Sequence, residues 1–189
     1  MKHSYRQRDF RNTNKVHIEH GVKIGRNTLI GPYCTIGAYT IIGNNTRLIG
    51  HDFLTERMRI ENNVFLGPGV IFLNDKYPPS PREDNVVVKD NVIIGGGSVI
   101  LPKVTINEDV VIGAGSLVIR DCGSGYVYWG RPARRRYTTD IYFRKQLRHA
   151  KTSSDPNLLK KLKHTILGTP AYRNLVWRNL PSYNQMLNR

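Results

Sequence analysis

Bulky apolar residues recur at every sixth position through most of this chain. A first run of such anchors extends from Ile18 to Phe72, and a second extends from Val88 to Val118. Gly often follows the anchor, and a small or β-branched residue often stands four positions after it. A period of six is neither the 3.6 of a helix nor the two of an ordinary strand. The pattern predicts a mainly β fold, a parallel β-helix in which three hexads form one triangular coil.

The repeat is interrupted once. After Phe72 the next anchor should fall at position 78, but the phase resumes only at Val88. The intervening residues, 74–86, contain three prolines and several charges, which cannot continue the coil. The sequence therefore predicts one extruded loop over 74–86, and a long loop in a repeat fold is often functional.

Stacking of the coils predicts a column of glycines. If residues one coil apart lie above one another, Gly67, Gly95 and Gly113 fall on one corner, beside the stacked anchors Leu66 and Ile94. Positions without side chains let an extended ligand lie against the backbone. The turn at the corner is the better explanation for any one of these glycines taken alone, so the case for a ligand groove depends on the column as a whole.

Composition sets the domain organisation. The 189 residues, 39% of them hydrophobic, predict one domain with an appendage: a lead-in over 1–15, a β-helix over 16–130 and a basic α-helical extension over 131–189. The first ten residues carry no apolar run that would form a signal peptide, and no apolar stretch is long enough to span a membrane. Two cysteines cannot form a disulfide framework, which favours a reducing, cytoplasmic location.

The net charge of +15 is concentrated in the extension, where residues 132–189 hold 13 of the 29 Lys and Arg residues but only two acidic side chains, Asp140 and Asp155. We therefore expect no nucleic-acid partner for the β-helix. The extension predicts helices over 140–151, 155–167 and 171–179, the first of them capped by Thr139.

One predicted helix of the extension is amphipathic and basic, because Lys160, Lys161 and Lys163 alternate with leucines. It can pack on the β-helix or on a neighbouring subunit. It can also bind an anionic membrane surface, which would make the protein peripheral to a membrane, or bind polyphosphate ligands.

Three segments resemble hexapeptide-repeat acyltransferases: residues 94–106, residues 112–118, and residues 126–137 with their Gly-Arg-Pro-Ala-Arg stretch. The resemblance covers residues 16–136. It implies a left-handed β-helix, a homotrimer, and acetyl-CoA bound as co-substrate along the groove between adjacent prisms.

The resemblance also implies which residues hold acetyl-CoA. It places the backbones of four residues along the pantetheine arm: Gly95, Gly96, Gly113 and Ala114. It places Arg131 and Arg134 near the adenosine phosphates, with Lys103 as a further candidate. A bulky residue at Gly113 is therefore expected to weaken acetyl-CoA binding without unfolding the protein.

The extruded loop resembles that of nucleotide-linked amino-sugar N-acetyltransferases. The sugar and antibiotic O-acetyltransferases carry a His-Pro pair in this loop, whereas here Tyr77 precedes Pro78. An alcohol must lose a proton as it attacks a thioester, so O-transfer needs a positioned base. A neutral amine needs mainly orientation and a polarised carbonyl. Asn74 is a candidate for orienting the amine or the acetyl oxygen and Asp75 for steadying the amine, although both residue types also favour turns.

His51 is the alternative catalytic candidate. It stands beside Asp52 in the central coils, where the pair can act as a base with its orienting carboxylate or simply form an exposed corner. The other histidines lie before or on the first coil or on tail helices, and none has the spacing of a ligand set. We therefore expect no catalytic metal.

The sequence thus predicts an acetyl-CoA-dependent N-acetyltransferase that acts on the amino group of a nucleotide-linked amino sugar in glycan or polysaccharide precursor synthesis. Two alternatives remain open. One is a sugar O-acetyltransferase with His51 as base. The other is a non-catalytic β-helix that serves as an assembly or docking module.

Overall fold

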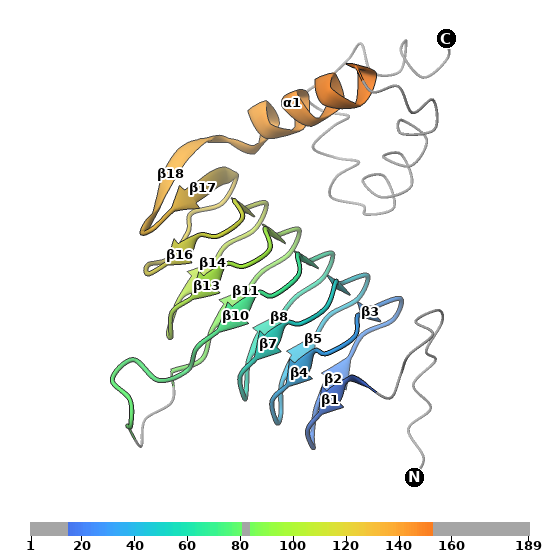
Figure 1. Cartoon of the computed structure of the whole chain (residues 1–189), viewed down its shortest axis with the longest axis vertical. Helices are drawn as coiled ribbons and strands as arrows, with labels where there is room; N and C mark the ends of the chain where they lie inside the picture. The colour runs from blue at the N-terminus through green and yellow to red at the C-terminus, as the bar shows by residue number, and fades with distance from the viewer. Residues whose placement is uncertain (1–14, 81–83, 153–189) are drawn as a thin grey trace.

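The computed structural model describes residues 15–80 and 84–152. Within them the chain forms a stack of triangular coils whose sides are three parallel sheets (Figure 1). The predicted parallel β-helix with a C-terminal helix is confirmed. The lead-in expected over 1–15, apart from Lys15, and the helices expected over 155–167 and 171–179 lie outside the described residues.

Three sheets, here named A, B and C, form the sides of the prism, and each strand of the coils contains two residues. Sheet A consists of β1 (His17–Ile18), β4 (Thr35–Ile36), β7 (Phe53–Leu54), β10 (Ile71–Phe72), β13 (Val99–Ile100) and β16 (Leu117–Val118). Sheet B consists of β2 (Lys23–Ile24), β5 (Ile41–Ile42), β8 (Arg59–Ile60), β11 (Val87–Val88) and β14 (Thr105–Ile106). Sheet C consists of β3 (Leu29–Ile30), β6 (Arg47–Leu48), β9 (Phe65–Leu66), β12 (Ile93–Ile94) and β15 (Val111–Ile112), followed by two longer strands.

The register between coils confirms the phase of the repeat. Ile18 pairs with Ile36, 18 residues later, whereas Phe72 pairs with Ile100, 28 residues later. The difference of ten residues is the extruded loop, which leaves the stack after β10 and returns at β11 (Figure 1). The coils above and below the loop therefore continue one regular stack.

The core is a stack of apolar anchors, as the repeat predicts. Ile36, Leu54 and Phe72 are at most 1% exposed, and their equivalents on the other two sheets are buried in the same way. Small polar residues beside the anchors are also buried. The hydroxyl of Thr40 donates to the carbonyl of Thr55 at 2.9 Å, and that of Ser116 donates to Gly113 at 2.6 Å. These bonds satisfy the hydroxyls, which would otherwise be costly in a core.

The corner between sheets B and C is held by a ladder of amide side chains. The amide nitrogens of Asn27, Asn45 and Asn63 each donate to the side-chain oxygen of the next coil, and the ladder ends on Asp109 through Asn91. These asparagines have φ between 55° and 65°, a left-handed conformation that Asn tolerates.

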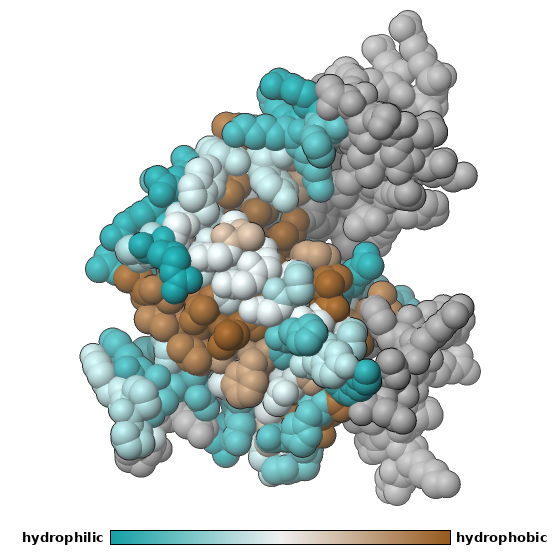
Figure 2. Space-filling model, viewed as in Figure 1, coloured by the Kyte–Doolittle hydropathy of each residue, from teal (hydrophilic) through white to brown (hydrophobic). Residues whose placement is uncertain are grey.

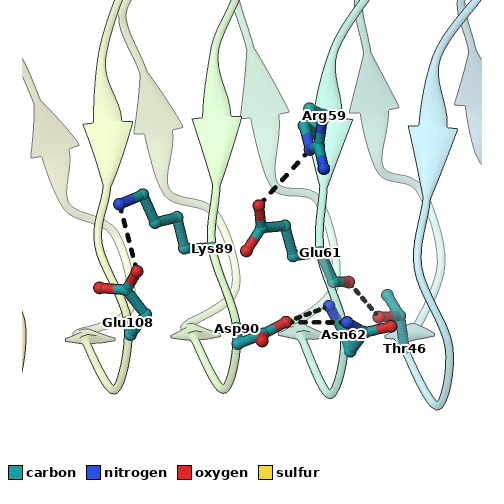
Figure 3. Close-up of polar contacts among 7 residues, drawn as sticks. All are labelled: Thr46, Arg59, Glu61, Asn62, Lys89, Asp90 and Glu108. Atoms are coloured by element: carbon teal, nitrogen blue, oxygen red, sulfur yellow. Dashed lines mark hydrogen bonds and ion pairs between the residues drawn. The ribbon is translucent and has the colours of Figure 1, made fainter.

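A second row of polar contacts runs beside this ladder. Figure 3 shows Asn62 donating from its backbone and side-chain nitrogens to Asp90, and Thr46 donating to the carbonyl of Glu61. The ion pair between Lys89 and Glu108, at 3.1 Å, lies in the neighbouring coils of the same picture. The polar side chains named at the B/C corner already bond to one another or to the backbone, so few of them are available to a ligand.

A hairpin and a helix cover the last coil. Strands β17 (Tyr126–Gly130) and β18 (Ala133–Thr138) pair antiparallel, and α1 (Thr139–Thr152) follows directly (Figure 1). Thr139 begins the helix as predicted, and Phe143 is 6% exposed. The structure differs from the sequence-based expectation at the start of the extension, where residues 133–138 form a strand. No helix in the described part of the chain is long and apolar enough to cross a membrane.

The outer surface of sheet A carries exposed apolar residues. Phe53 and Ile71 occupy adjacent rungs and are 44% and 39% exposed. Figure 2 shows apolar residues gathered on the face where Figure 1 places β7, β10 and β13, beside the extruded loop. Exposed apolar residues of this kind often pack against another copy of the chain. The surface is compatible with the homotrimer, which stays a prediction.

Candidate functional site

The corner between sheets C and A, here the C/A corner, carries a column of five residues in the left-handed conformation. From the first coil upward they are Tyr33, His51, Gly69, Gly97 and Gly115, with φ between 57° and 71°. The amide of each donates to a carbonyl in the coil before it, for example from His51 to Pro32 at 2.9 Å and from Gly97 to Pro68 at 2.9 Å. The five residues therefore lie one above another.

The three glycines of this column face open space. A Cβ built on Gly69, Gly97 or Gly115 would meet no atom within 4 Å. Gly97 and Gly115 are exposed. We call these three residues the open glycine column. An extended ligand can approach the backbone closely along it, because no side chain intervenes.

The glycines proposed from the sequence have a different role in the packing. A Cβ on Gly95 would come within 2.4 Å of the backbone nitrogen of Ala114, and a Cβ on Gly96 would come within 2.8 Å of the carbonyl oxygen of Pro68. Glycine is thus required at both positions because the backbone of a neighbouring coil approaches too closely for a side chain. Gly67, Gly95 and Gly113 do stack on one corner as expected, but their missing side chains point at the next coil.

Sequence reasoning missed the open glycine column, although it lies only two residues from the proposed one. The available signal was the register, since residues 69, 97 and 115 are equivalent to Tyr33 and His51. Ala114, also proposed from the sequence, is exposed beside Gly115.

Arg131 stands at the upper end of the column. It follows β17, and its Nη1 donates to the carbonyl oxygen of Gly115 at 3.4 Å. This contact uses one of the five guanidinium N–H groups, so the others remain able to bind an anion. Arg134 lies on β18 opposite Trp129 and is exposed, so the hairpin carries both predicted arginines.

The lower end of the column is a stack of rings. The imidazole of His51 lies on the phenol ring of Tyr33, with centroids 4.8 Å apart and planes inclined by 24°. The ammonium of Lys15 lies 5.0 Å from the centroid of the Tyr33 ring. His51 is exposed, so a flat and accessible surface closes the column from below.

Asp52 turns away from solvent rather than forming a dyad with His51. It is 1% exposed, and its two carboxylate oxygens accept hydrogen bonds from the backbone amides of Val70 at 2.9 Å and Gly50 at 3.2 Å. The thiol of Cys34 lies 3.7 Å from the second oxygen. Burial raises the pKa of Asp52 to about 6. The described hydrogen bonds of Asp52 thus shape the corner beneath His51.

The extruded loop begins at the opposite edge of sheet A. The carboxylate of Asp75 accepts hydrogen bonds from the amides of Tyr77 at 2.9 Å and Ser80 at 2.8 Å, which fold the loop back on itself. The amide of Asp84 donates to the carbonyl of Asn74 at 2.8 Å and closes the base of the loop. Within one chain, Asn74, Asp75 and Lys103 therefore lie at a different corner from the open glycine column.

The chain matches the family model described as bacterial transferase hexapeptide (six repeats), over residues 15–50 and 85–120. The two matched segments lie on either side of the extruded loop. The hexapeptide-repeat resemblance predicted from the sequence is therefore confirmed.

One curated relative and two solved structures illustrate what the chain is similar to. It is 31% identical over 89 residues to an acyl-[acyl-carrier-protein]–UDP-N-acetylglucosamine O-acyltransferase from Rickettsia canadensis, which covers 47% of this chain and 32% of the relative. It superimposes on a maltose O-acetyltransferase from Clostridium difficile with a TM-score of 0.55 and 28% identity, over 63% of this chain and 70% of the other.

The second solved structure is a GDP-perosamine N-acetyl transferase from Caulobacter crescentus, in complex with CoA and GDP-perosamine. The TM-score is 0.55 and the identity is 22%, over 65% of this chain and 53% of the other, which supports the fold alone. The chain spans between about a third and a half of the length of the curated relatives it matches.

Proposed function

We propose that this protein is an acetyl-CoA-dependent N-acetyltransferase that acts on the amino group of a nucleotide-linked amino sugar, in glycan or polysaccharide precursor synthesis. In the reaction the amine nitrogen forms a bond to the acetyl carbonyl carbon. The bond from that carbon to the CoA sulfur breaks, and the proton lost by the amine balances the charge on the departing thiolate.

The observation that carries this proposal is the open glycine column between His51 and Arg131. From Gly69 to Gly115 it spans two coil intervals, about 10 Å. A narrow, side-chain-free strip of this length fits an extended arm such as acyl-pantetheine. Arg131 at its upper end can bind the phosphates of CoA, so the acyl group would point toward Gly69 and His51.

The surroundings of His51 favour an amine over an alcohol as acceptor. A strong general base needs its proton acceptor held in one orientation, commonly by a carboxylate. Here the carboxylate of Asp52 is committed to the amides of Gly50 and Val70. An amine that arrives unprotonated does not need such a base. Because Asn74 lies at another corner within one chain, its proposed role in orienting the amine falls to the loop of a neighbouring subunit in the predicted homotrimer.

Sugar O-acetyl transfer is the second candidate, because the chain resembles a maltose O-acetyltransferase at 28% identity. In that case His51 would remove the proton of the hydroxyl. The rate would follow the titration of an imidazole, whereas N-transfer should accelerate until the acceptor amine is fully neutral.

The test is thiol release from acetyl-CoA with GDP-perosamine, a dTDP-linked amino sugar and maltose as acceptors. We expect turnover with at least one amino sugar and little with maltose. Turnover with maltose alone would establish the second candidate, and no thiol release with any acceptor would favour a docking module without chemistry.

A substitution in the open glycine column tests where the donor lies. Asn adopts φ near 60° at four successive positions of the B/C corner, so Gly97→Asn should fold while placing a side chain in the column. We expect its affinity for acetyl-CoA to fall by tenfold or more, on the order of 1.4 kcal/mol. Gly125→Asn is the matched control, because Gly125 also has positive φ and open space but lies outside the column.

A further inference from the structure

The stacked rings below the open glycine column form a surface that no step of the transfer has so far used. We propose that the His51 imidazole binds the flat face of the acceptor's sugar ring, at the level of Gly69. This inference rests on the proposed function, because it states how the acceptor of that reaction is held.

The stack is built from the first coil upward. The ammonium of Lys15 lies near the Tyr33 ring, and the imidazole of His51, one coil further along, stacks on that ring. Tyr33 is 49% exposed and His51 is exposed, yet both have positive φ. Equivalent positions at the B/C corner are asparagines and Asp109, whereas those at the A/B corner include Tyr39, Arg57 and Lys103, so the two rings are distinguished by their stacking and exposure rather than by their backbone conformation.

The level above His51 is vacant. The two rings are 4.8 Å apart, close to the spacing of neighbouring strands in a sheet, so the stack follows the coils of the prism. The next residue in the column is Gly69, and a Cβ there would meet no atom within 4 Å. A ligand ring at this level would contact the free face of His51 at the spacing at which His51 contacts Tyr33.

The reaction determines which ring of a nucleotide sugar lies on His51. With the donor phosphates at Arg131, the arm passes Gly115 and Gly97, and the acyl group ends just above the level of Gly69, which is left for the sugar ring. The amine must reach that acyl group, so the ring that carries the amine must be adjacent to it. The nucleobase is separated from this ring by the diphosphate and the ribose. A pyranose can direct C–H groups at an aromatic face and exclude water from it.

The experiment measures binding without turnover. The probes are dTDP-glucose, UDP-glucose and GDP-mannose, which have no free amine, each compared with its nucleoside diphosphate by calorimetry. The nucleotide sugar that binds wild type most tightly is then tested on His51→Asn, which removes the ring but tolerates positive φ, and on His51→Phe, which keeps a ring.

We expect His51→Asn to weaken binding of the nucleotide sugar by about tenfold, toward the lower end of the range for a nucleobase stacked on an aromatic side chain. Binding of the nucleoside diphosphate should not change, and His51→Phe should remain near wild type. His20→Ala is the matched control, because His20 also contacts a tyrosine, Tyr39, but at the corner between sheets A and B. Thermal melts show whether each variant is folded.

Several results would overturn the inference. One is an unchanged affinity of folded His51→Asn for the nucleotide sugar. Another is an equal loss of affinity for the nucleoside diphosphate, which would place the nucleobase, and not the sugar, on the His51 ring. The third is that no probe binds to wild type. A different result would refute the proposed function but not the stacking site. Binding that depends on His51 without acetylation of any amino sugar would retain the stacking site and refute the acetyltransferase.

Discussion

A Cβ built on Gly113 would lie 2.8 Å from the Cβ of Trp129, well inside van der Waals contact. Trp129 belongs to β17, so this contact fixes how closely the hairpin approaches the last full coil. Side chains at this position must displace the hairpin. We therefore expect a bulky residue at Gly113 to disturb the packing of the hairpin as well as the binding of acetyl-CoA.

We expect Gly113→Ala to lower the free energy of unfolding by about 1–3 kcal/mol, the usual cost of overpacking. Urea denaturation followed by circular dichroism measures the change. Gly123→Ala is a matched control, because the added Cβ would lie 3.6 Å from the hydroxyl of Tyr128, an ordinary contact. Equal stability of the two variants would contradict the packing role of Gly113.

Asn74 should affect catalysis rather than folding. If its amide orients the amine or polarises the acetyl carbonyl, Asn74→Ala should lower kcat by about tenfold to a thousandfold, as for loss of a single oxyanion donor. Steady-state kinetics with a productive amino-sugar nucleotide provide the measurement. A nearly normal kcat, combined with an inactive His51→Phe, would instead support O-transfer with His51 as base.

Asp75 should act through the shape of the loop. Its carboxylate accepts two loop amides, so Asp75→Ala leaves the amides of Tyr77 and Ser80 without that partner. We expect faster hydrogen exchange at both amides and a higher KM for the acceptor. Asn74→Ala serves as the control, because the hydrogen bond from Asp84 goes to its backbone carbonyl and survives the substitution. Unchanged exchange in Asp75→Ala would remove the loop-shaping role.

Asp52 should make the protein less stable as pH rises through the weakly acidic range. Its pKa in the fold is about 6, above the ordinary 3.8, so between these values the folded state binds more protons than the unfolded state. The free energy of unfolding should therefore fall by roughly 3 kcal/mol from below pH 4 to above pH 6. In Asp52→Asn this loss should be absent. Parallel pH profiles for wild type and Asp52→Asn, measured by urea titration, would contradict the assignment.

The basic C-terminal residues remain a proposed membrane contact. A chain that ends at Thr152 keeps Phe143 and all of α1, while it removes Lys160, Lys161 and Lys163. We expect wild type to sediment with vesicles rich in anionic phosphatidylserine at low salt, and the shortened chain to remain in the supernatant. Sedimentation of both chains would exclude these lysines as the contact, and loss of the oligomer on truncation would support subunit packing.

Much of the fold follows from the sequence because the repeat overdetermines it. One strand out of phase would bring anchors such as Ile36 and Leu54 to the surface, so the period alone sets the register. The hairpin is different. In β18 the three successive arginines, Arg134 to Arg136, are all exposed, so no alternation of apolar residues marks the strand. Its pairing with β17 stabilises it, and such pairing leaves no local signal.

The candidate site was less predictable for a related reason. Gly95 and Gly97 are the same residue type in one turn, and only the backbone geometry separates them. The first packs against the next coil, whereas the second has φ of 67° and faces open space. The burial of Asp52 is likewise a property of the turn, since nothing beside it in the sequence distinguishes a carboxylate turned inward from one that orients His51.

The extruded loop has a consequence for how this protein can change. Val87 pairs directly with Arg59 of the coil before the loop, so the solenoid closes as though the inserted residues were absent. Loop length is thus uncoupled from the geometry of the C/A corner, where the open glycine column lies. We expect that the loop can be replaced by mutation or grafting without moving the open glycine column, so that acceptor preference can change while the proposed donor site is kept.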